Sequence, residues 1–224
     1  MQNIQTRRGT ISQVNFNSRI GAVYKYIGLS ILMAAFGSYM GMQNIGMLQG
    51  MMFWGFIILE FAFLIGLYIY KEKEGLNIFL LFGFTFLSGF TLAPILTLTL
   101  GLSNGADILT NALLATSVAV GAISLYAINT KRDFSGMGKY LFVALIVVIV
   151  IAVVNMFMQS SLLHMVISGV SGILFSFYLI YDTQNIVNNR FDHPMTAAVG
   201  VYIDILNIFL SILNLMLAFS GNKD

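Results

Sequence analysis

The sequence predicts an all-α integral membrane protein in which seven helices cross the bilayer. Of its 224 residues, 58% are hydrophobic and 9% are charged, and the mean hydropathy is +0.87. Soluble domains contain about a quarter charged residues, so this composition excludes an ordinary globular protein. Apolar runs of about twenty residues recur along the chain, and each is long enough to cross a hydrocarbon core of about 30 Å as a helix.

Seven apolar runs with short connections divide the chain. The expected helices are 20–42, 48–70, 76–100, 108–128, 140–158, 162–187 and 195–219. They form one transmembrane domain, 20–219, between a short cytoplasmic N-terminal segment, 1–19, and a C-terminal tail, 220–224. Segment 1–19 is too polar for the core of a signal peptide, so the first helix is expected to remain in the mature protein.

Positive charges in the connections predict the orientation. They lie before the first helix or at its start, and after the second, fourth and sixth helices: Arg7, Arg8, Arg19, Lys25, Lys71, Lys73, Lys131, Arg132, Lys139 and Arg190. The opposite connections contain no Lys or Arg, apart from Lys223 near the C-terminus. The positive-inside rule places the N-terminus in the cytoplasm and the C-terminus outside. The same rule would also accept six helices, so the number seven depends on the apolar runs.

Three carboxylates lie inside apolar segments: Glu60, Asp182 and Asp204. An ionisable group at the bilayer centre costs about 2.5–3.5 kcal/mol on insertion scales, so its retention indicates a function in handling protons or cations. With a rise of 1.5 Å per residue, Asp182 lies about 7 Å and Asp204 about 14 Å from the inner ends of their helices. Because none of the three can face lipid cheaply, we expect a shared site in the inner half of the bilayer.

An Asp-x-x-Asn pattern occurs in each of the last two helices: Asp182 with Asn185, and Asp204 with Asn207. The offset of three residues places each amide beside its carboxylate, where it can donate to the carboxylate or offer an oxygen to a cation. Ser211 and Asn214 extend this polar face along the last helix. Hydrogen bonding between helices explains these last two residues equally well.

Two neighbouring carboxylates in a low dielectric are expected to share one proton and to titrate as a unit. Loss of that proton leaves a repulsive pair that a hard divalent cation can compensate, and calcium prefers such oxygen ligands. Zinc or copper would favour Cys or His ligands. Cys is absent, and His164 and His193 lie at helix ends or in loops. We therefore expect no resident cofactor, with calcium as a permeant or bound ion at Asp182 and Asp204.

Three segments resemble the Bax inhibitor-1 family, also called the transmembrane Bax inhibitor motif family. They are FLLFGFTFLSGFTLAPIL from Phe79, GVSGILFSFYLIYDTQNIV from Gly169 and VYIDILNIFLSILNLM from Val201. The resemblance spans the second to the seventh helix, and the short N-terminus and compact loops are similar to those of bacterial members. It implies a multi-pass protein of the bacterial inner membrane, with seven helices of which the C-terminal one is central. It also implies a pH-sensitive calcium leak gated by an aspartate pair, here Asp182 and Asp204, with Glu60 matching the acid of the second helix.

Lys71 departs from this pattern. Some bacterial members of the family have an Arg there that latches onto the aspartates, and Lys lacks the bidentate geometry of the guanidinium group. The alternative is an anchor, in which the Lys71 ammonium reaches the membrane surface and contributes to the positive-inside pattern.

Three functions are compatible with these residues. The first is a pH-regulated calcium leak that uses Asp182, Asp204 and Glu60, with Asn185 and Asn207 along the ion path. The second is an interaction protein, because some bacterial relatives are linked to a membrane-embedded AAA protease, and the third is a proton-coupled transporter. No enzyme motif is present, and a net charge of +2 confined to loops does not indicate nucleic-acid binding. Gly37 and Gly41 are expected to pack inside a monomer.

Overall fold

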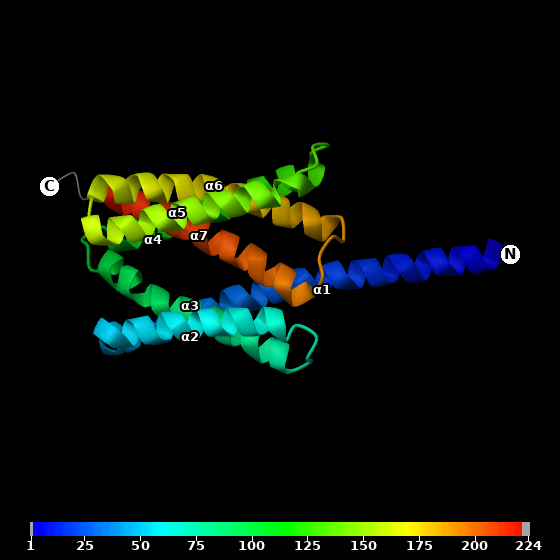
Figure 1. The fold of residues 1–224 in the computed structure, drawn as a ribbon, viewed down its shortest axis with the longest axis horizontal. Coiled ribbons are helices and arrows are strands. Elements are labelled where there is room, and N and C mark those ends of the chain that lie inside the picture. The colour runs from blue at the N-terminus through cyan, green and yellow to red at the C-terminus, as the bar shows by residue number, and fades with distance from the viewer. Residues whose placement is uncertain (1, 221–224) are drawn as a thin grey trace. The chain divides into compact units, whose positions relative to one another are not determined.

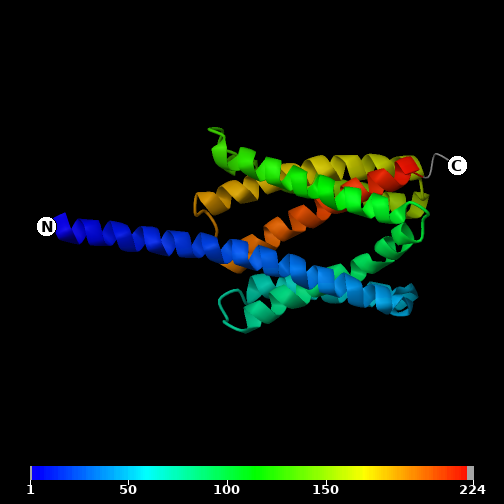
Figure 2. The ribbon, with the colours of Figure 1, turned by 180° about the vertical axis from the view of Figure 1, so that it is seen from behind.

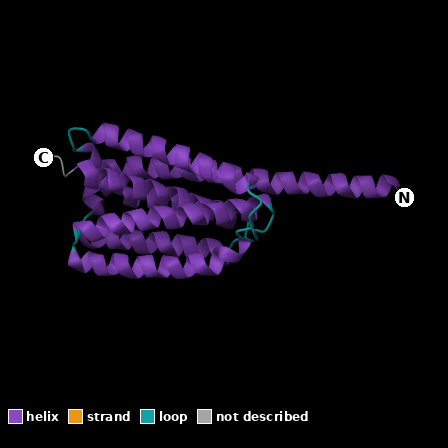
Figure 3. Ribbon diagram, turned by 90° about the horizontal axis from the view of Figure 1, so that it is seen from above, coloured by secondary structure: helices purple, strands orange, loops and turns teal. Residues whose placement is uncertain are grey.

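The computed structural model describes residues 2–220, and side chains from residue 17 onward. Within this range every regular element is a helix, as Figure 3 shows. The seven long helices are α1 Gln2–Gln43, α2 Gly50–Ile69, α3 Leu76–Leu100, α4 Gly105–Asn129, α5 Gly138–Met158, α6 Ser161–Val187 and α7 Pro194–Ser220. All seven contain a segment long and apolar enough to cross a membrane, which confirms the predicted fold class.

The first helix differs from its predicted bounds. It begins at Gln2, whereas its apolar span begins at Asn17. Most of the expected N-terminal segment is therefore the start of α1 rather than a separate element, and Figure 3 shows it as one continuous helix. Apolar periodicity could not predict this extension because the residues are polar. At the other end Ser220 still belongs to α7, and the rest of the expected tail lies outside the described residues.

Contacts between residues divide the chain into two units. Unit one contains Met1–Leu92 and Asn185–Gly200, and unit two contains Ala93–Gln184 and Val201–Asp224. Helices α3, α6 and α7 each pass from one unit into the other. In α3 the change falls beside Pro94, which has no backbone N–H to give to the helix.

Glycines allow close packing of helices in unit one, where α1, α2 and the first part of α3 lie side by side (Figures 1 and 2). A Cβ atom at Gly37 of α1 would overlap the backbone carbonyl of Phe86 in α3. A Cβ atom at Gly89 of α3 would likewise overlap the backbone of Ala34 in α1. These contacts confirm that Gly37 packs inside the monomer, because small residues let two helix backbones approach.

Aromatic side chains join α2 to α3 in the same unit. The rings of Phe56 and Phe90 have centroids 5.0 Å apart, and those of Phe63 and Phe79 are 5.5 Å apart. Such tilted pairs stabilise by about 0.5–1.5 kcal/mol beyond the area they bury.

Unit two is built from α4, α5, most of α6 and α7, and the end of α3. A Cβ atom at Gly172 of α6 would lie 3.1 Å from the Cβ atom of Ser211, so α6 and α7 are in close contact there. In the most apolar segment of each helix, 44% of the residues of α3 and 39% of those of α7 are buried. The corresponding share is 6% in both α2 and α5. Helices α3 and α7 are therefore the most enclosed of the seven, and the central position expected for the C-terminal helix stays a prediction.

We predict that Gly37→Ala destabilises the protein by about 1–3 kcal/mol, because the added methyl group forces the α1 and α3 backbones apart. Thermal unfolding in detergent would measure the change. Gly28→Ala is the matched control, since it makes the same substitution in the same helix and its Cβ atom meets nothing within 4 Å. Equal midpoints for Gly37→Ala and the wild type would contradict the packing described for α1 and α3.

Candidate functional site

Asp204 is the most enclosed of the predicted acids. It lies on α7 in unit two and is only 3% exposed. Its Oδ2 atom is buried and has no hydrogen-bond partner. A buried charge of this kind is costly unless a proton, a cation or a donor compensates it. Asp204 is thus the polar group of unit two that most needs a ligand.

Asp182 lies on α6 in the same unit and is less enclosed than Asp204. The two carboxylates are near enough for their charges to interact, and the predicted sharing of a proton between them stays a prediction. Tyr178, one turn before Asp182, interacts electrostatically with both. The tyrosine was not among the predicted site residues, although its offset of four from Asp182 places it on the same helix face.

A buried glutamine fixes the part of α6 that contains Asp182. The Nε2 atom of Gln184 donates to the backbone oxygens of Arg132 at 2.8 Å and Ala127 at 3.3 Å, and its Oε1 atom accepts from the backbone N–H of Phe134 at 2.9 Å. Gln184 therefore ties α6 to the connection between α4 and α5. The sequence did not lead us to expect this role of Gln184, although a glutamine within an apolar helix indicates a buried polar contact.

The two predicted amides belong to different units. Asn207 lies in unit two, one turn beyond Asp204, and its Nδ2 atom donates to the backbone oxygen of Ile203 at 2.8 Å. This bond leaves the Oδ1 atom of Asn207 for another partner. Asn185 begins the second segment of unit one, near the end of α6, where its backbone oxygen accepts from Arg190 at 2.7 Å.

Glu60 belongs to unit one, where its Oε2 atom accepts a hydrogen bond of 2.9 Å from the Thr91 hydroxyl. The same hydroxyl also contacts the backbone oxygen of Ser88 at 3.1 Å. Glu60 thus has a donor of its own in α3. Its convergence with Asp182 and Asp204 stays a prediction.

Lys71 forms an ion pair with Asp192, in the connection between α6 and α7. Arg19 reinforces the same connection by donating to the backbone oxygens of Phe191 and Asp192, each at 3.2 Å, and by stacking 4.8 Å above the Phe191 ring. We call these four residues of unit one the loop clamp. The partner of Lys71 is therefore Asp192, and a latch to the aspartate pair stays a prediction.

The loop clamp keeps its charges through neutral pH. The hydrogen bond from Lys71, and next its positive charge, hold the pKa of Asp192 below the ordinary value, and the same hydrogen bond raises the pKa of Lys71. Stabilisation from Asp192 is present above its unfolded pKa and is lost as pH falls through the lowered folded pKa. Stabilisation from Lys71 is lost only as pH rises through its raised folded pKa. The ion pair therefore does not change its charges near neutral pH.

The aspartate pair supplies only part of a cation site. In the described part of the chain, no three side chains among His, Asp and Glu are grouped so that they could hold a metal ion. Calcium takes six to eight oxygen ligands, so a cation at the pair would complete its shell with amide or backbone oxygens or with water.

Comparison with known sequences identifies the family. The family described as "Inhibitor of apoptosis-promoting Bax1" matches residues 16–221, which include all seven apolar spans. The chain belongs to the Bax inhibitor-1 family. The resemblance expected from the three sequence segments is thereby confirmed.

Proteins from a bacterium, a virus and a plant are similar to this chain. An uncharacterized protein of Helicobacter pylori is 44% identical over 203 residues, which cover 91% of this chain and 87% of that protein. The "Golgi anti-apoptotic protein" of vaccinia virus is 31% identical over 149 residues, covering 66% of this chain and 61% of the viral protein. A "BI1-like protein" of Arabidopsis thaliana is 33% identical over 164 residues, covering 71% and 62%.

We predict that Asp192→Asn loosens the connection between α6 and α7, because the amide cannot replace the charge that Lys71 needs. Hydrogen exchange of residues 188–193 should accelerate at neutral pH in this variant. In the wild type it should accelerate only in acid, below the ordinary pKa range of Asp. Glu74→Gln is the control, since it removes a nearby exposed charge outside the loop clamp. Unchanged exchange in Asp192→Asn would show that the ion pair does not hold the connection.

Proposed function

We propose that this protein is a pH-sensitive cation leak, chiefly for calcium, in which Asp182 and Asp204 form the gate. The observation that carries the proposal is the enclosed Asp204 side chain, with an oxygen that has no hydrogen-bond partner and a neighbouring acid. A structural role would be better served by a neutral, hydrogen-bonded residue. An acid pair in this setting supports ion handling instead.

The proposed gate uses the chemistry of the shared proton. With one proton between them, the two carboxyl groups attract each other through a hydrogen bond, and the path is closed. When the proton leaves, the two negative charges repel, and a hard cation becomes the natural compensation. Acidification closes the path and higher pH opens it. Gln184 keeps the α6 segment in place while the charges change.

The proposed cellular setting is the inner membrane of a bacterium, with the N-terminus in the cytoplasm and the C-terminus outside. The Lys and Arg residues of alternate connections support this orientation. The bacterial relatives, including the protein of Helicobacter pylori, support the location. An odd number of spanning helices supports this proposed placement of the two ends on opposite sides.

A second candidate is an interaction protein that modulates another membrane protein, such as a membrane-embedded AAA protease. The name of the vaccinia virus relative favours it, because that name refers to apoptosis and not to ion flow. In this case the acid pair would hold α6 and α7 together. A proton-coupled transporter is a third candidate, and it would move protons in stoichiometric exchange for the cation.

Replacement of Asp204 by Asn separates these candidates. The amide keeps the size and hydrogen-bonding capacity of the carboxyl but cannot take part in a shared-proton equilibrium. We expect calcium flux into proteoliposomes to depend on pH in the wild type and to lose most of this dependence in Asp204→Asn. Asp182→Asn should behave alike, and the double variant should add little because the two acids act as one unit.

Asp107→Asn is the matched control, because it neutralises a carboxylate in the first turn of α4, away from the pair. Its flux should match the wild type at every pH. A folded Asp204→Asn protein with the same pH profile as the wild type would defeat the leak proposal. Absence of any calcium flux in the wild type would defeat it too, and the interaction protein would then become the leading candidate.

A further inference from the structure

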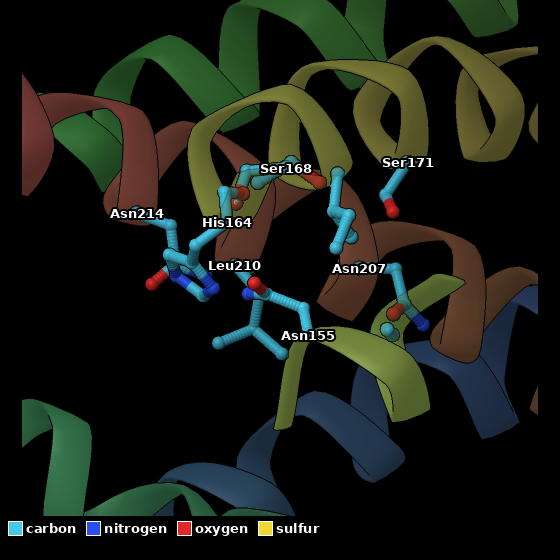
Figure 4. A pocket seen from close by; sticks show the side chains of 10 residues that line it. Asn155, His164, Ser168, Ser171, Asn207, Leu210 and Asn214 are labelled. Carbon is cyan, nitrogen blue, oxygen red and sulfur yellow. Dashed lines mark hydrogen bonds between the residues drawn. The ribbon is translucent and has the colours of Figure 1, made fainter. Parts of the chain in front are cut away.

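A polar cavity of about 210 Å³ lies in unit two between α5, α6 and α7 (Figure 4). Its polar lining includes Asn155, His164, Ser171, Asn207, Ser211 and Asn214. A water molecule takes about 30 Å³ in the liquid, so the cavity has room for several. No carboxylate lines this cavity, so its surface is neutral or carries at most the charge of one histidine.

The cavity contains polar groups that the protein itself leaves without partners. Asn155 uses its Oδ1 atom to accept from the backbone N–H of Ser160 at 3.1 Å, which leaves its Nδ2 atom free. The hydrogen bond from the Nδ2 atom of Asn207 to the backbone oxygen of Ile203 leaves the Oδ1 atom of Asn207 available for another partner. The amide of Asn214 has no hydrogen-bond partner within the described part of the chain. Amide groups with unused donors and acceptors are suited to bind water or a polar solute.

A second cavity, of about 510 Å³, continues from the first. The two share Asn155, His164 and Asn214, and the second also reaches Gln159 and Ser161 in the turn between α5 and α6. In Figure 4, His164 and Asn214 lie at one end of the first cavity, and Ser171 and Asn207 lie at the other. The two cavities therefore form one route from the α5–α6 turn to Asn207.

This route ends one helical turn from Asp204. Asn214, Asn207 and Asp204 share one face of α7. With a rise of 1.5 Å per residue, Asn207 lies about 10 Å below Asn214, and Asp204 about 4.5 Å further. Asp204 also has a buried oxygen, Oδ2, that lacks a hydrogen-bond partner. The close contact of Gly172 with Ser211 on the α6–α7 boundary borders the route without filling it.

We propose that the two cavities are a water-filled vestibule through which cations and protons reach Asp204 from the membrane face that contains the α5–α6 turn. The assignment of the vestibule to ion passage rests on the proposed function of the aspartate pair. Amide and hydroxyl groups can replace part of the hydration shell of a cation. Because no carboxylate lines the first cavity, these groups do not hold the cation permanently, and this suits the passage of an ion.

Cysteine accessibility tests the vestibule directly, because the chain contains no native Cys. Ser171→Cys and Asn207→Cys introduce thiols into the first cavity. Ile173→Cys is the matched control, since it lies two residues from Ser171 on the same helix and Ile173 is 63% exposed on the outer surface of unit two. Ser161→Cys, in the α5–α6 turn, marks the side from which the vestibule should open.

The probe is a membrane-impermeant cationic methanethiosulfonate added to oriented vesicles. From the side that labels Ser161→Cys, it should modify Ser171→Cys and Asn207→Cys at least about tenfold faster than Ile173→Cys, because the reaction needs a thiolate and therefore water. Ser171→Cys is nearly isosteric, so the test survives if Asn207→Cys does not fold. Equal, slow modification of Ser171→Cys and Ile173→Cys would overturn the vestibule. Modification of Ser171→Cys only from the side opposite to Ser161→Cys would overturn it too.

Flux measurements on the same variants separate the vestibule from the proposed function. If the wild type conducts calcium, modification of Ser171→Cys should reduce the flux several-fold, and modification of Ile173→Cys should not. Unchanged flux after complete modification of Ser171→Cys would overturn ion passage through the vestibule. Rapid modification of Ser171→Cys in a protein that conducts no calcium would defeat the leak proposal and its ion passage, while confirming water access.

Discussion

Asp204 is only 3% exposed inside an apolar helix bundle, so a proton, a cation or a hydrogen-bond donor must compensate the charge of its carboxylate. For one oxygen of Asp204 the protein supplies no donor. This constraint explains the features around it. Asp182 provides the second acid of the pair, Gln184 fixes the α6 segment on which Asp182 lies, and the polar face of α7 leads towards Asp204. The burial of this acid thus accounts for the polar residues around it in unit two.

The polar interactions of unit one have a different character. Lys71 and Asp192 are exposed to water and keep their opposite charges through neutral pH, and Glu60 has a hydroxyl donor in Thr91. The loop clamp therefore holds the connection between α6 and α7 at every physiological pH. The proposed response to pH is assigned to the acid pair because its two groups are buried in the membrane-spanning part, where charges interact more strongly than in bulk water.

The sequence was sufficient for features that follow from regular spacing. Apolar runs predicted the seven helices. Comparable depth in neighbouring helices placed Asp182 and Asp204 in one site, and that pairing stays a prediction. The partners of Lys71 and Glu60 could not be predicted, because contacts between distant segments follow from tertiary packing. The helical start of α1 also escaped prediction, since its polar residues carry no apolar period. The cavity beside Asn207 depends on how α5, α6 and α7 pack, and the polar face of α7 was its one signal in the sequence.

The central claim is that Asp182 and Asp204 titrate as one unit with a shared proton. Infrared difference spectroscopy of the carboxyl C=O stretch, recorded across a pH series in lipid, tests it most directly when the wild type is compared with Asp182→Asn and Asp204→Asn. The account predicts that either substitution shifts the titration of the remaining acid, because the proton belongs to the pair. Two acids that titrate independently, each unaffected by the loss of the other, would contradict it.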